Sequence, residues 1–503
     1  MKKLKLNMVV ALLSNLIYIF TGIVAQRFIL RSYGSEINGL TGSITQLLAY
    51  FTLLEAGLGI ASVQALYKPL ANNDTKAVEG ILSATSRQYK KIGEFFLLCT
   101  VILSAAMPFI SNSSLDGGLV FIITLLMGAG SAVNYLFIGR YQVLLQADRK
   151  VYVLNILDSV LGSLFTVIRI TLINMGQSIV LVQSVALISP LVRIVILRIY
   201  FRICYKNLSY KAEPDFRAIS KRKFVFVHQI VGMINSQTAV TILTVMATLS
   251  QVSVYSVYNL IYSNIRTVVS STFATAVEPS FGKLAGGDSA TLNKYYKFYE
   301  LMFTYFLSWL LSVALVMTIP FVTRYTAGVE GINYIDPILA VLFMASIYLN
   351  LVRIPALMMV NVSGAFRETQ KGAVLEAVIN IVVSVAAFLV IGMRGLLLGN
   401  CVARLYRVWD IESYAYRHVI RVKLSSWLRL FLFNAAAIVL FVGLMDLSGL
   451  IRYATWLQWI GSGFICSALG AVFYLLAMGI AYPREARAIV GSLVKKLRHR
   501  TAA

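Results

Sequence analysis

Charged residues are scarce in this chain of 503 residues, where they make up 13% of the total against 58% for hydrophobic residues. A soluble protein of this length needs about a quarter of its residues charged to cover its surface. Proline, with 9 residues, and glycine, with 33, are too few for a collagen-like or low-complexity disordered chain. The apolar residues must therefore face a solvent other than water, and the composition indicates a lipid bilayer.

The sequence also lacks the residue patterns that hold cofactors. P-loop, HExxH and GxSxG motifs are absent. The four cysteines lie at no metal-ligand spacing from one another. We therefore expect no disulfide framework, no metal and no cofactor, and we expect neither ATP-driven transport by this chain alone nor enzymatic activity. The cysteines are Cys99, Cys204, Cys401 and Cys466.

Fourteen apolar segments follow one another along the chain, each long enough to cross about 30 Å of hydrocarbon as a helix. The sequence thus predicts an all-α polytopic membrane protein with about 14 transmembrane helices. The predicted spans are 7–31, 37–68, 88–110, 117–144, 151–173, 177–203, 224–248, 251–282, 296–322, 334–363, 371–392, 396–416, 428–446 and 455–480.

Lysine and arginine are distributed unevenly between the predicted loops. The side of the N-terminus carries 34 of the 45, whereas the opposite side carries 4 and the spans contain seven. By the positive-inside rule, both termini are expected in the cytoplasm. The basic residues form short clusters between spans and no continuous stripe. We therefore expect anionic phospholipids as partners and no nucleic acid.

Short similar stretches recur 212 to 218 positions apart, as in Leu70–Asp74 and Leu284–Asp288, and indicate an internal repeat. Six spans is an even number, so the two halves would be parallel repeats, with the substrate cleft at their interface and alternating access by rocking. Five parts are predicted. They are an N-terminal lobe at 1–203, a basic cytoplasmic linker at 204–223, a C-terminal lobe at 224–417, two appended spans at 418–480, and a basic cytoplasmic tail at 481–503.

The spans hold seven arginines against four clearly embedded acids. An arginine keeps its proton, and its planar guanidinium group binds phosphate oxygens in pairs. The surplus therefore predicts an anionic ligand, with internal ion pairing and snorkelling to the interface as the alternative. The candidate residues for a cationic, phosphate-binding cavity are Arg27, Arg193, Arg266, Arg353 and Arg404.

Other polar side chains also lie within predicted spans. Glu55, Asp158 and Glu376 are candidates for ion coupling or for structural pairing. Three tyrosines with i, i+3, i+7 spacing share one helix face. They are candidates for stacking on sugar rings, with helix packing or an interfacial aromatic belt as the alternative. These tyrosines are Tyr255, Tyr258 and Tyr262.

Five motifs near the start of the chain carry a family resemblance. They are Arg27–Leu30, Tyr33–Leu40, Leu54–Gly59, Leu66–Leu70 and Tyr89–Gly93. In these motifs the chain resembles the bacterial polysaccharide-transporter family, which holds the O-antigen and capsule flippases of the Wzx type. This family belongs to the multidrug/oligosaccharidyl-lipid/polysaccharide (MOP) exporter superfamily.

The resemblance implies a two-lobed transporter in the bacterial cytoplasmic membrane. Such a protein moves an undecaprenyl-pyrophosphate-linked oligosaccharide from the inner to the outer leaflet, and the polysaccharide polymerase and assembly machinery are its expected partners. Arginines on the first and eighth spans contribute to cationic cavities in this superfamily, and Arg27 and Arg266 are the matching positions. The two appended spans resemble the lipid-tail groove of peptidoglycan-precursor flippases.

Three other functions remain as alternatives at this stage. A cation-coupled multidrug exporter of the same fold would favour a cavity with an excess of acids, which the arginine surplus contradicts. A membrane polysaccharide polymerase or glycosyltransferase would place catalytic residues in sizeable outer loops, whereas the outer loops here are short. A scaffold without transport activity would leave the embedded arginines unexplained.

Overall fold

The computed structural model describes residues 2–55, 57–206, 208, 212–219, 223–275, 277–285, 289–483 and 485. Within these residues the chain is helical and contains no β-strand. Parts of the expected basic linker, at 207, 209–211 and 220–222, lie outside the described residues. The same is true of the expected basic tail at 484 and 486–503.

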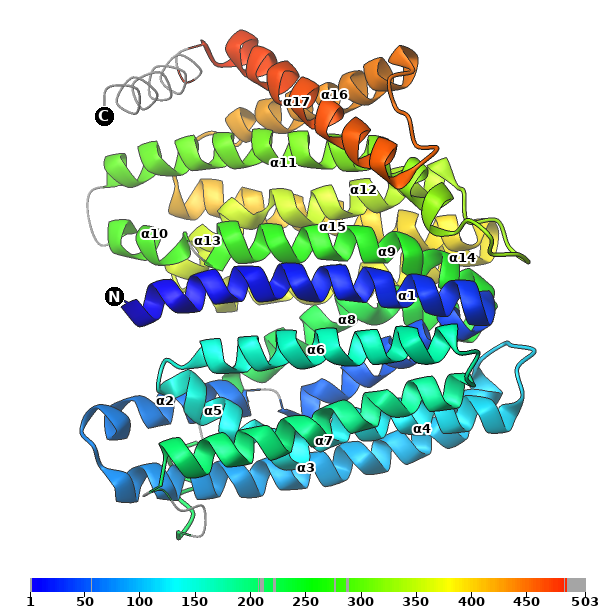
Figure 1. Cartoon of the computed structure of the whole chain (residues 1–503). Helices are drawn as coiled ribbons and strands as arrows, with labels where there is room; N and C mark the ends of the chain where they lie inside the picture. The colour runs from blue at the N-terminus through cyan, green and yellow to red at the C-terminus, as the bar shows by residue number, and fades with distance from the viewer. Residues whose placement is uncertain are drawn as a thin grey trace, which may run out of the picture. The chain divides into compact units, whose positions relative to one another are not determined.

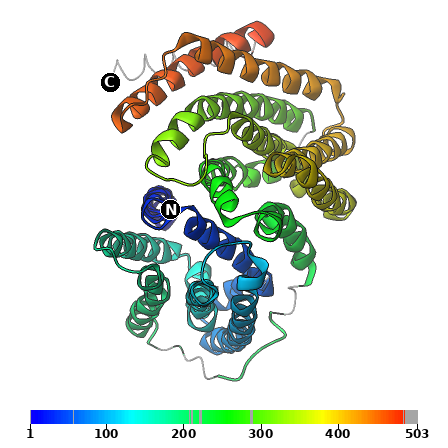
Figure 2. The ribbon, with the colours of Figure 1, turned by 90° about the vertical axis from the view of Figure 1, so that its right-hand side faces the viewer.

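The contacts within the chain divide it into two compact units, residues 1–256 with 328–332 and residues 257–327 with 333–503. In the first unit α3, α4, α6 and α7 run side by side, and α6 also packs on α1 (Figures 1 and 2). Its elements are α1 (Lys2–Phe51), η1 (Thr52–Glu55), α2 (Leu58–Ala71), α3 (Thr75–Ile110), α4 (Gly117–Val133), η2 (Asn134–Ile138), α5 (Gly139–Ala147), α6 (Val151–Asn174), α7 (Ile179–Cys204), α8 (Lys223–Met246) and the start of α9 (Leu249–Val269).

The second unit continues from α9 to the end of the described chain. Helices α14 and α15 form its most extensive pair, and α12 packs on α15. Its further elements are η4 (Ser270–Thr275), α10 (Glu278–Ala285), α11 (Ser289–Tyr325), α12 (Pro337–Val352), α13 (Ile354–Val362), α14 (Phe366–Ile391), α15 (Met393–Tyr414), η5 (Ala415–Val419), α16 (Ser425–Ser448) and α17 (Trp456–Ala481).

The expected set of about 14 membrane helices is confirmed by this order of elements. Nine helices in the described part of the chain are long and apolar enough to cross a bilayer, or ten when the bent pair formed by α1 and α2 counts as one. The remaining expected spans correspond to the start of α1 and to α8, α9 and α15. Large apolar side chains face outward, for example Phe109 at 90%, Val390 at 81% and Leu457 at 80% exposure. Water would oppose that exposure, whereas lipid tails accept it.

The element order confirms the expected repeat of six spans. Helix α3 begins at Thr75 and α11 at Ser289, which is 214 positions later. Helices α6 and α14 begin 215 positions apart, at Val151 and Phe366. The interruptions recur too, because α4 gives way to a π-helical turn at η2 and α12 ends at a break before α13. Each half therefore places an irregular stretch of backbone in its fourth span.

Helix α8 belongs by its contacts to the first unit. The sequence analysis assigns it to the predicted C-terminal lobe, and that assignment stays a prediction. In the structure α8 packs on α1, where the hydroxyl groups of Thr244 and Ser43 lie 2.8 Å apart and those of Thr241 and Tyr50 lie 3.1 Å apart. These polar pairs between helices satisfy side chains that lipid could not.

Helices α16 and α17, the two expected appended spans, pack on α11 in the second unit. The indole nitrogen of Trp309 donates to the carbonyl oxygen of Ser467 at 2.9 Å, and Ser312 and Tyr474 share a hydrogen bond of 2.6 Å. A Cβ atom on Gly470 would lie 2.8 Å from the Trp309 ring, so glycine permits this close approach. The two helices are thus integral to the unit.

Helix α1 joins the first two predicted spans in one run of 50 residues with a kink at Gly34. Gly34 has φ 82° and ψ −179°, a backbone region that only glycine occupies readily. The loop expected between residues 31 and 37 is therefore one sharply bent residue. A second bend follows, where α2 is inclined by 42° to the preceding segment Ile19–Glu55.

Replacement of Gly34 by alanine is expected to destabilise the protein by about 1–3 kcal/mol, because the kink holds a conformation that a Cβ atom disfavours. The measurement is equilibrium unfolding in mixed micelles. The matched control is Gly22→Ala on the same helix, where a Cβ atom meets nothing within 4 Å. Equal stability of the two variants would contradict the assignment of the kink to glycine.

Candidate anion-binding site

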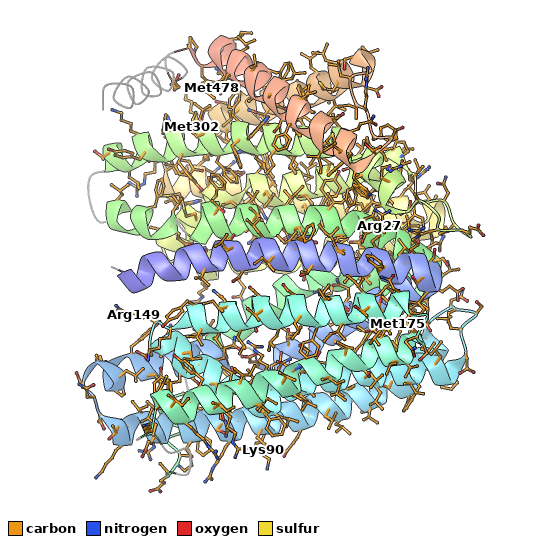
Figure 3. All side chains as sticks on the ribbon, viewed as in Figure 1. Arg27, Lys90, Arg149, Met175, Met302 and Met478 are labelled. Carbon is orange, nitrogen blue, oxygen red and sulfur yellow. The ribbon has the colours of Figure 1, made fainter. Side chains whose placement is uncertain are left out.

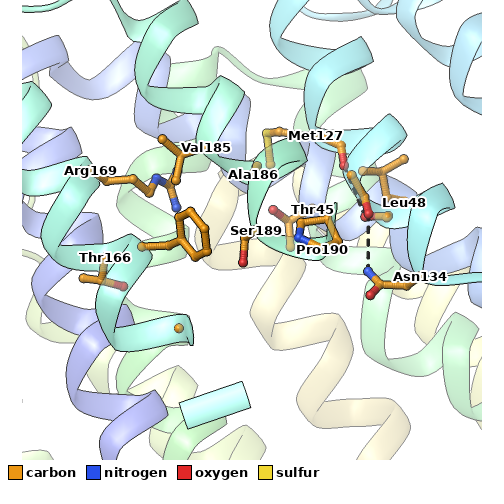
Figure 4. Close-up of a pocket in the computed structure, with 14 residues that line it drawn as sticks. Thr45, Leu48, Met127, Asn134, Thr166, Arg169, Val185, Ala186, Ser189 and Pro190 are labelled. Carbon is orange, nitrogen blue, oxygen red and sulfur yellow. Dashed lines mark hydrogen bonds between the residues drawn. The ribbon is translucent and has the colours of Figure 1, made fainter. Parts of the chain in front are cut away.

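The first unit contains a pocket of about 370 Å³ between α1, α4, η2, α6 and α7 (Figure 4). Small and polar residues line much of it, together with one charged side chain, Arg169 on α6. Pro190 of α7 also lines the pocket. The polar lining residues are Thr45, Ser131, Asn134, Thr166, Arg169 and Ser189.

Arg169 enters this pocket as a cation without a carboxylate partner in the described part of the chain. Its Nη2 donates to the side-chain oxygen of Gln183 on α7 at 2.7 Å. The Nε atom of Arg169 and the amide nitrogen of Gln183 are buried and make no hydrogen bond within the described residues. The pair therefore places one positive charge at the pocket and keeps two donors without acceptors close to it. This setting favours an anion in the pocket, because an anion supplies both negative charge and acceptor atoms.

Two further residues that line the pocket, Gly130 and Pro190, determine the backbone geometry there. A Cβ atom on Gly130 would lie 2.4 Å from the carbonyl oxygen of Ala186, so α4 and α7 touch backbone to backbone there. Pro190, four residues after Ala186, has no N–H group with which to bond that carbonyl oxygen. The sequence thus keeps this part of the pocket narrow and leaves a helix carbonyl near it.

Arg193 lies on α7 one turn beyond Pro190, and Asp158 of α6 binds it. The guanidinium group lies 2.9 Å from one Asp158 oxygen and donates to the other at 3.0 Å. It also donates to the Asn134 oxygen at 3.5 Å, which links the ion pair to the pocket. Arg193 and Asp158, predicted for ligand binding and coupling, are therefore brought together as partners, and their charges offset each other.

Glu55 lies where the second span breaks, in the 3₁₀ turn η1 between α1 and α2. Its carboxylate accepts a hydrogen bond from the Tyr89 hydroxyl group of α3. Structural pairing is one of the two roles predicted for Glu55, and the partner that the structure shows is this tyrosine. Glu55 also lines a second pocket of about 370 Å³ together with Gly57, Gly59 and Met233. An acid at a helix break beside a pocket suits a cation, and its coupling role stays a prediction.

Arg353 and Glu376 meet in the second unit. Arg353 ends α12, and its Nη1 lies 2.9 Å from Oε1 of Glu376 on α14. Arg407 of α15 lies 3.6 Å from the other Glu376 oxygen and also binds Asp410 and the carbonyl oxygen of Thr369. Two arginines and two acids thus form a balanced network. Arg353 contributes little net charge to its surroundings, and its ligand-binding role stays a prediction.

The other three arginines occupy separate positions. Arg404 on α15 donates to the carbonyl oxygen of Ser346 on α12 at 2.6 Å, which ties these two helices together. Arg27 lies on α1 (Figure 3), and Arg266 lies in the last turn of α9, just before the π-helical η4. Arg27 belongs to the first unit and Arg266 to the second.

The tyrosine stripe on α9 is buried. Tyr258 donates to the carbonyl oxygens of Tyr334 and Asp336, and Tyr262 shares a hydrogen bond of 3.1 Å with Thr318. The rings of Tyr258 and Tyr262 both stack on one phenylalanine of α12 at 5.8 Å between centroids. This is the packing alternative for the stripe, and sugar stacking would require these rings to be uncovered. The remaining ring, of Tyr255, is buried as well.

Two lysines, Lys150 and Lys90, differ in how far they are exposed to solvent. Lys150 lies 2.7 Å from Asp148, and the Tyr205 hydroxyl group donates to the same carboxylate at 2.6 Å. Burial raises the pKa of Tyr205, and the hydrogen bond to Asp148 raises that pKa further. The Lys90 side chain on α3, by contrast, is 71% exposed (Figure 3). Its ion pair with the exposed Glu94 is long, at 3.8 Å. Lys90 is therefore a described lysine that is accessible to anionic phospholipids.

Arg169 is one of the seven embedded arginines but is not among the predicted ligand-binding residues, because an arginine near a helix end can snorkel to the interface. Its distance from the end of α6, at Asn174, is only one turn and a half, which favoured that reading. Gln183 on the next span is the residue in the sequence that could have indicated a neutral partner for Arg169. An arginine bound to a neutral amide keeps its full charge, but only the structure shows that the two residues are paired.

Solved transporter structures share this fold. The lipid II flippase MurJ in an inward closed conformation matches with a TM-score of 0.70 at 15% sequence identity, covering 95% of this chain and 99% of that one. An inward-facing multidrug resistance MATE family transporter of the MOP superfamily matches with 0.61 at 15% identity, covering 82% and 99%. A MATE structure in complex with MaL6 matches with 0.55 at 14% identity, covering 82% and 96%. No protein-family model and no curated protein sequence matches the chain.

The chain therefore shares the fold of these solved transporters, and its apolar helices indicate a multi-pass membrane protein. The suspected resemblance is confirmed at the level of the fold. At 15% identity this likeness does not extend to the substrate.

Proposed function

We propose that this protein is a flippase that moves an undecaprenyl-pyrophosphate-linked oligosaccharide from the inner to the outer leaflet of the bacterial cytoplasmic membrane by alternating access. The observation that carries the proposal is Arg169, a buried cation without a carboxylate partner in the described chain, which lines a pocket together with serine, threonine and asparagine side chains and has unused donors beside it.

The chemistry of a lipid-linked pyrophosphate explains why such a site is needed. Each unpaired polar group that enters hydrocarbon costs several kcal/mol, so a sugar pyrophosphate does not cross a bilayer unaided. A guanidinium group replaces water around phosphate oxygens through paired hydrogen bonds. The polyprenyl tail can stay in lipid, beside apolar faces such as that of α17, where Leu457 and Ile480 are each 80% exposed.

Cation-coupled drug export is the second candidate, because Glu55 lines its own pocket at the break between α1 and α2. A cationic drug would be held there by the carboxylate. The two candidates use different pockets and ligands of opposite charge, so one transport assay separates them.

Purified protein in liposomes is expected to transfer an undecaprenyl-pyrophosphate oligosaccharide between leaflets. The transfer is measured as access of the glycan to an impermeant glycan-modifying enzyme. The matched control is a polyprenyl glycoside of the same sugar and tail that lacks the pyrophosphate, which should not be transferred. Extrusion of a cationic dye without transfer of the pyrophosphate lipid would overturn the flippase and support the drug exporter.

A further inference from the structure

Two carboxyl groups are buried together at one end of the second unit. Glu300 of α11 is 4% exposed and Glu412 of α15 is fully buried. The hydroxyl groups of Tyr296 and Tyr416 donate to the two Glu300 oxygens, at 2.8 Å and 2.5 Å. Glu412 lies one turn before Tyr416, and neither of its oxygens has a hydrogen-bond partner among the described residues.

The charged surroundings of this pair are sparse. Glu300 is the neighbour that acts electrostatically on Glu412, and the exposed Lys297 is the described cation that acts on Glu300. Tyr482, just after α17, faces Glu300, and Tyr416 faces both acids from η5. Helix α13, which packs on η5 and α11, brings no titratable side chain. The remaining groups are the Tyr296 hydroxyl on α11 itself, and Glu485 and Arg429, which act on Tyr482. Arg429 lies on α16, which packs on α11.

Electrostatics allows only one full negative charge in this arrangement. Two carboxylates that share a buried site repel each other, and each also loses its hydration. Hydrogen bonds from two tyrosines stabilise a charge on Glu300, whereas nothing stabilises a charge on Glu412. The proton therefore belongs on Glu412.

We propose that Glu300 and Glu412 form a proton-binding site, in which Glu412 holds one proton and releases it when water reaches the pair. Loss of that proton adds a second negative charge beside Glu300, which favours a conformation in which water reaches both carboxylates. Three residues after Glu412 the chain enters the π-helical η5, a wide turn of the kind often found at functional sites. Proton binding is a property of the fold, whereas its use in driving transport rests on the proposed function.

The direct test is the infrared carbonyl band of a protonated carboxyl group in the purified full-length protein, followed as pH is raised. Wild type is expected to show a band that disappears with rising pH, and Glu412→Gln is expected to lack it. Glu94→Gln, at an exposed carboxyl, is the matched control and should keep the band. A band that persists in Glu412→Gln would overturn the proposal.

A second variant keeps the test decisive if Glu412→Gln does not fold. Glu300→Gln retains Glu412 but removes the negative charge that faces it. Since that charge opposes ionisation of Glu412, the midpoint of the band should move downward by about 1 pH unit or more. An unchanged midpoint would overturn the site. Loss of the band on adding Na⁺ at constant pH would also overturn it, in favour of a sodium site.

Transport is measured separately on the same preparations. If the proton drives movement, Glu412→Gln transfers substrate at a rate that no longer depends on pH, whereas the wild-type rate does. A pH-sensitive band with no transfer of the pyrophosphate lipid by wild type would retain the proton site and reject the proposed function. An absent band with intact transfer of the pyrophosphate lipid would reject the proton site and retain the proposed function.

Discussion

Replacement of Arg169 by methionine is expected to weaken transfer of the pyrophosphate lipid by about 10- to 100-fold while leaving the protein as stable as wild type or more stable. The loss follows from at least one charge-assisted hydrogen bond, worth about 1.5–3 kcal/mol, and each 1.4 kcal/mol is a factor of ten in affinity. Stability should not fall, because methionine fills similar space and removes a buried charge that lacks a carboxylate partner, which offsets the loss of the hydrogen bond to Gln183. Opposite signs in the two measurements distinguish a ligand-binding arginine from a structural one.

Two further variants make this test specific. Arg169→Lys keeps the charge but loses the planar fork, so we expect transfer between that of wild type and Arg169→Met. Arg198→Ala on α7 changes the net charge equally at an exposed position and should transfer substrate like wild type. Wild-type transfer by Arg169→Met, or an equal loss in Arg198→Ala, would move the anion site away from this pocket.

The sequence predicts the helical architecture well because the bilayer imposes simple rules. A span needs about 20 apolar residues, and basic residues collect on one side. Those rules recover helices such as α6 and α17 within a few residues. They do not reveal that α1 continues through Gly34, because a single residue with a positive φ leaves no loop for a hydropathy pattern to detect.

The candidate site is less accessible to sequence reasoning, because the effect of a buried charge depends on its partner. Arg353 and Arg169 look alike in the sequence, yet Glu376 offsets the first and only an amide meets the second. Glu376 precedes Arg407 by 31 positions and follows Arg353 by 23, so no short sequence spacing predicts the network. The same reason explains why Glu300 is not among the predicted site residues, since its partners Tyr416 and Glu412 are more than 100 positions away.

Glu376→Gln is expected to destabilise the protein by about 3–5 kcal/mol, because it leaves Arg353 buried without its acid. The Glu376 side chain is 5% exposed and that of Arg353 is 14% exposed, so water cannot replace the lost partner well. Equilibrium unfolding in mixed micelles measures the change. Glu368→Gln, at an exposed acid on the same helix, is the matched control and should stay within about 0.5 kcal/mol of wild type.

The double variant Arg353→Met with Glu376→Leu should recover most of the lost stability, since an apolar pair replaces a buried ion pair at little cost. Arg407 keeps Asp410 and the carbonyl oxygen of Thr369, so it is not left unpaired. A double variant as unstable as Glu376→Gln would contradict the pairing. Transport by the double variant then decides the role of Arg353. If the double variant is stable and transfers substrate, the network is structural. If it is stable but does not transfer substrate, Arg353 binds the ligand.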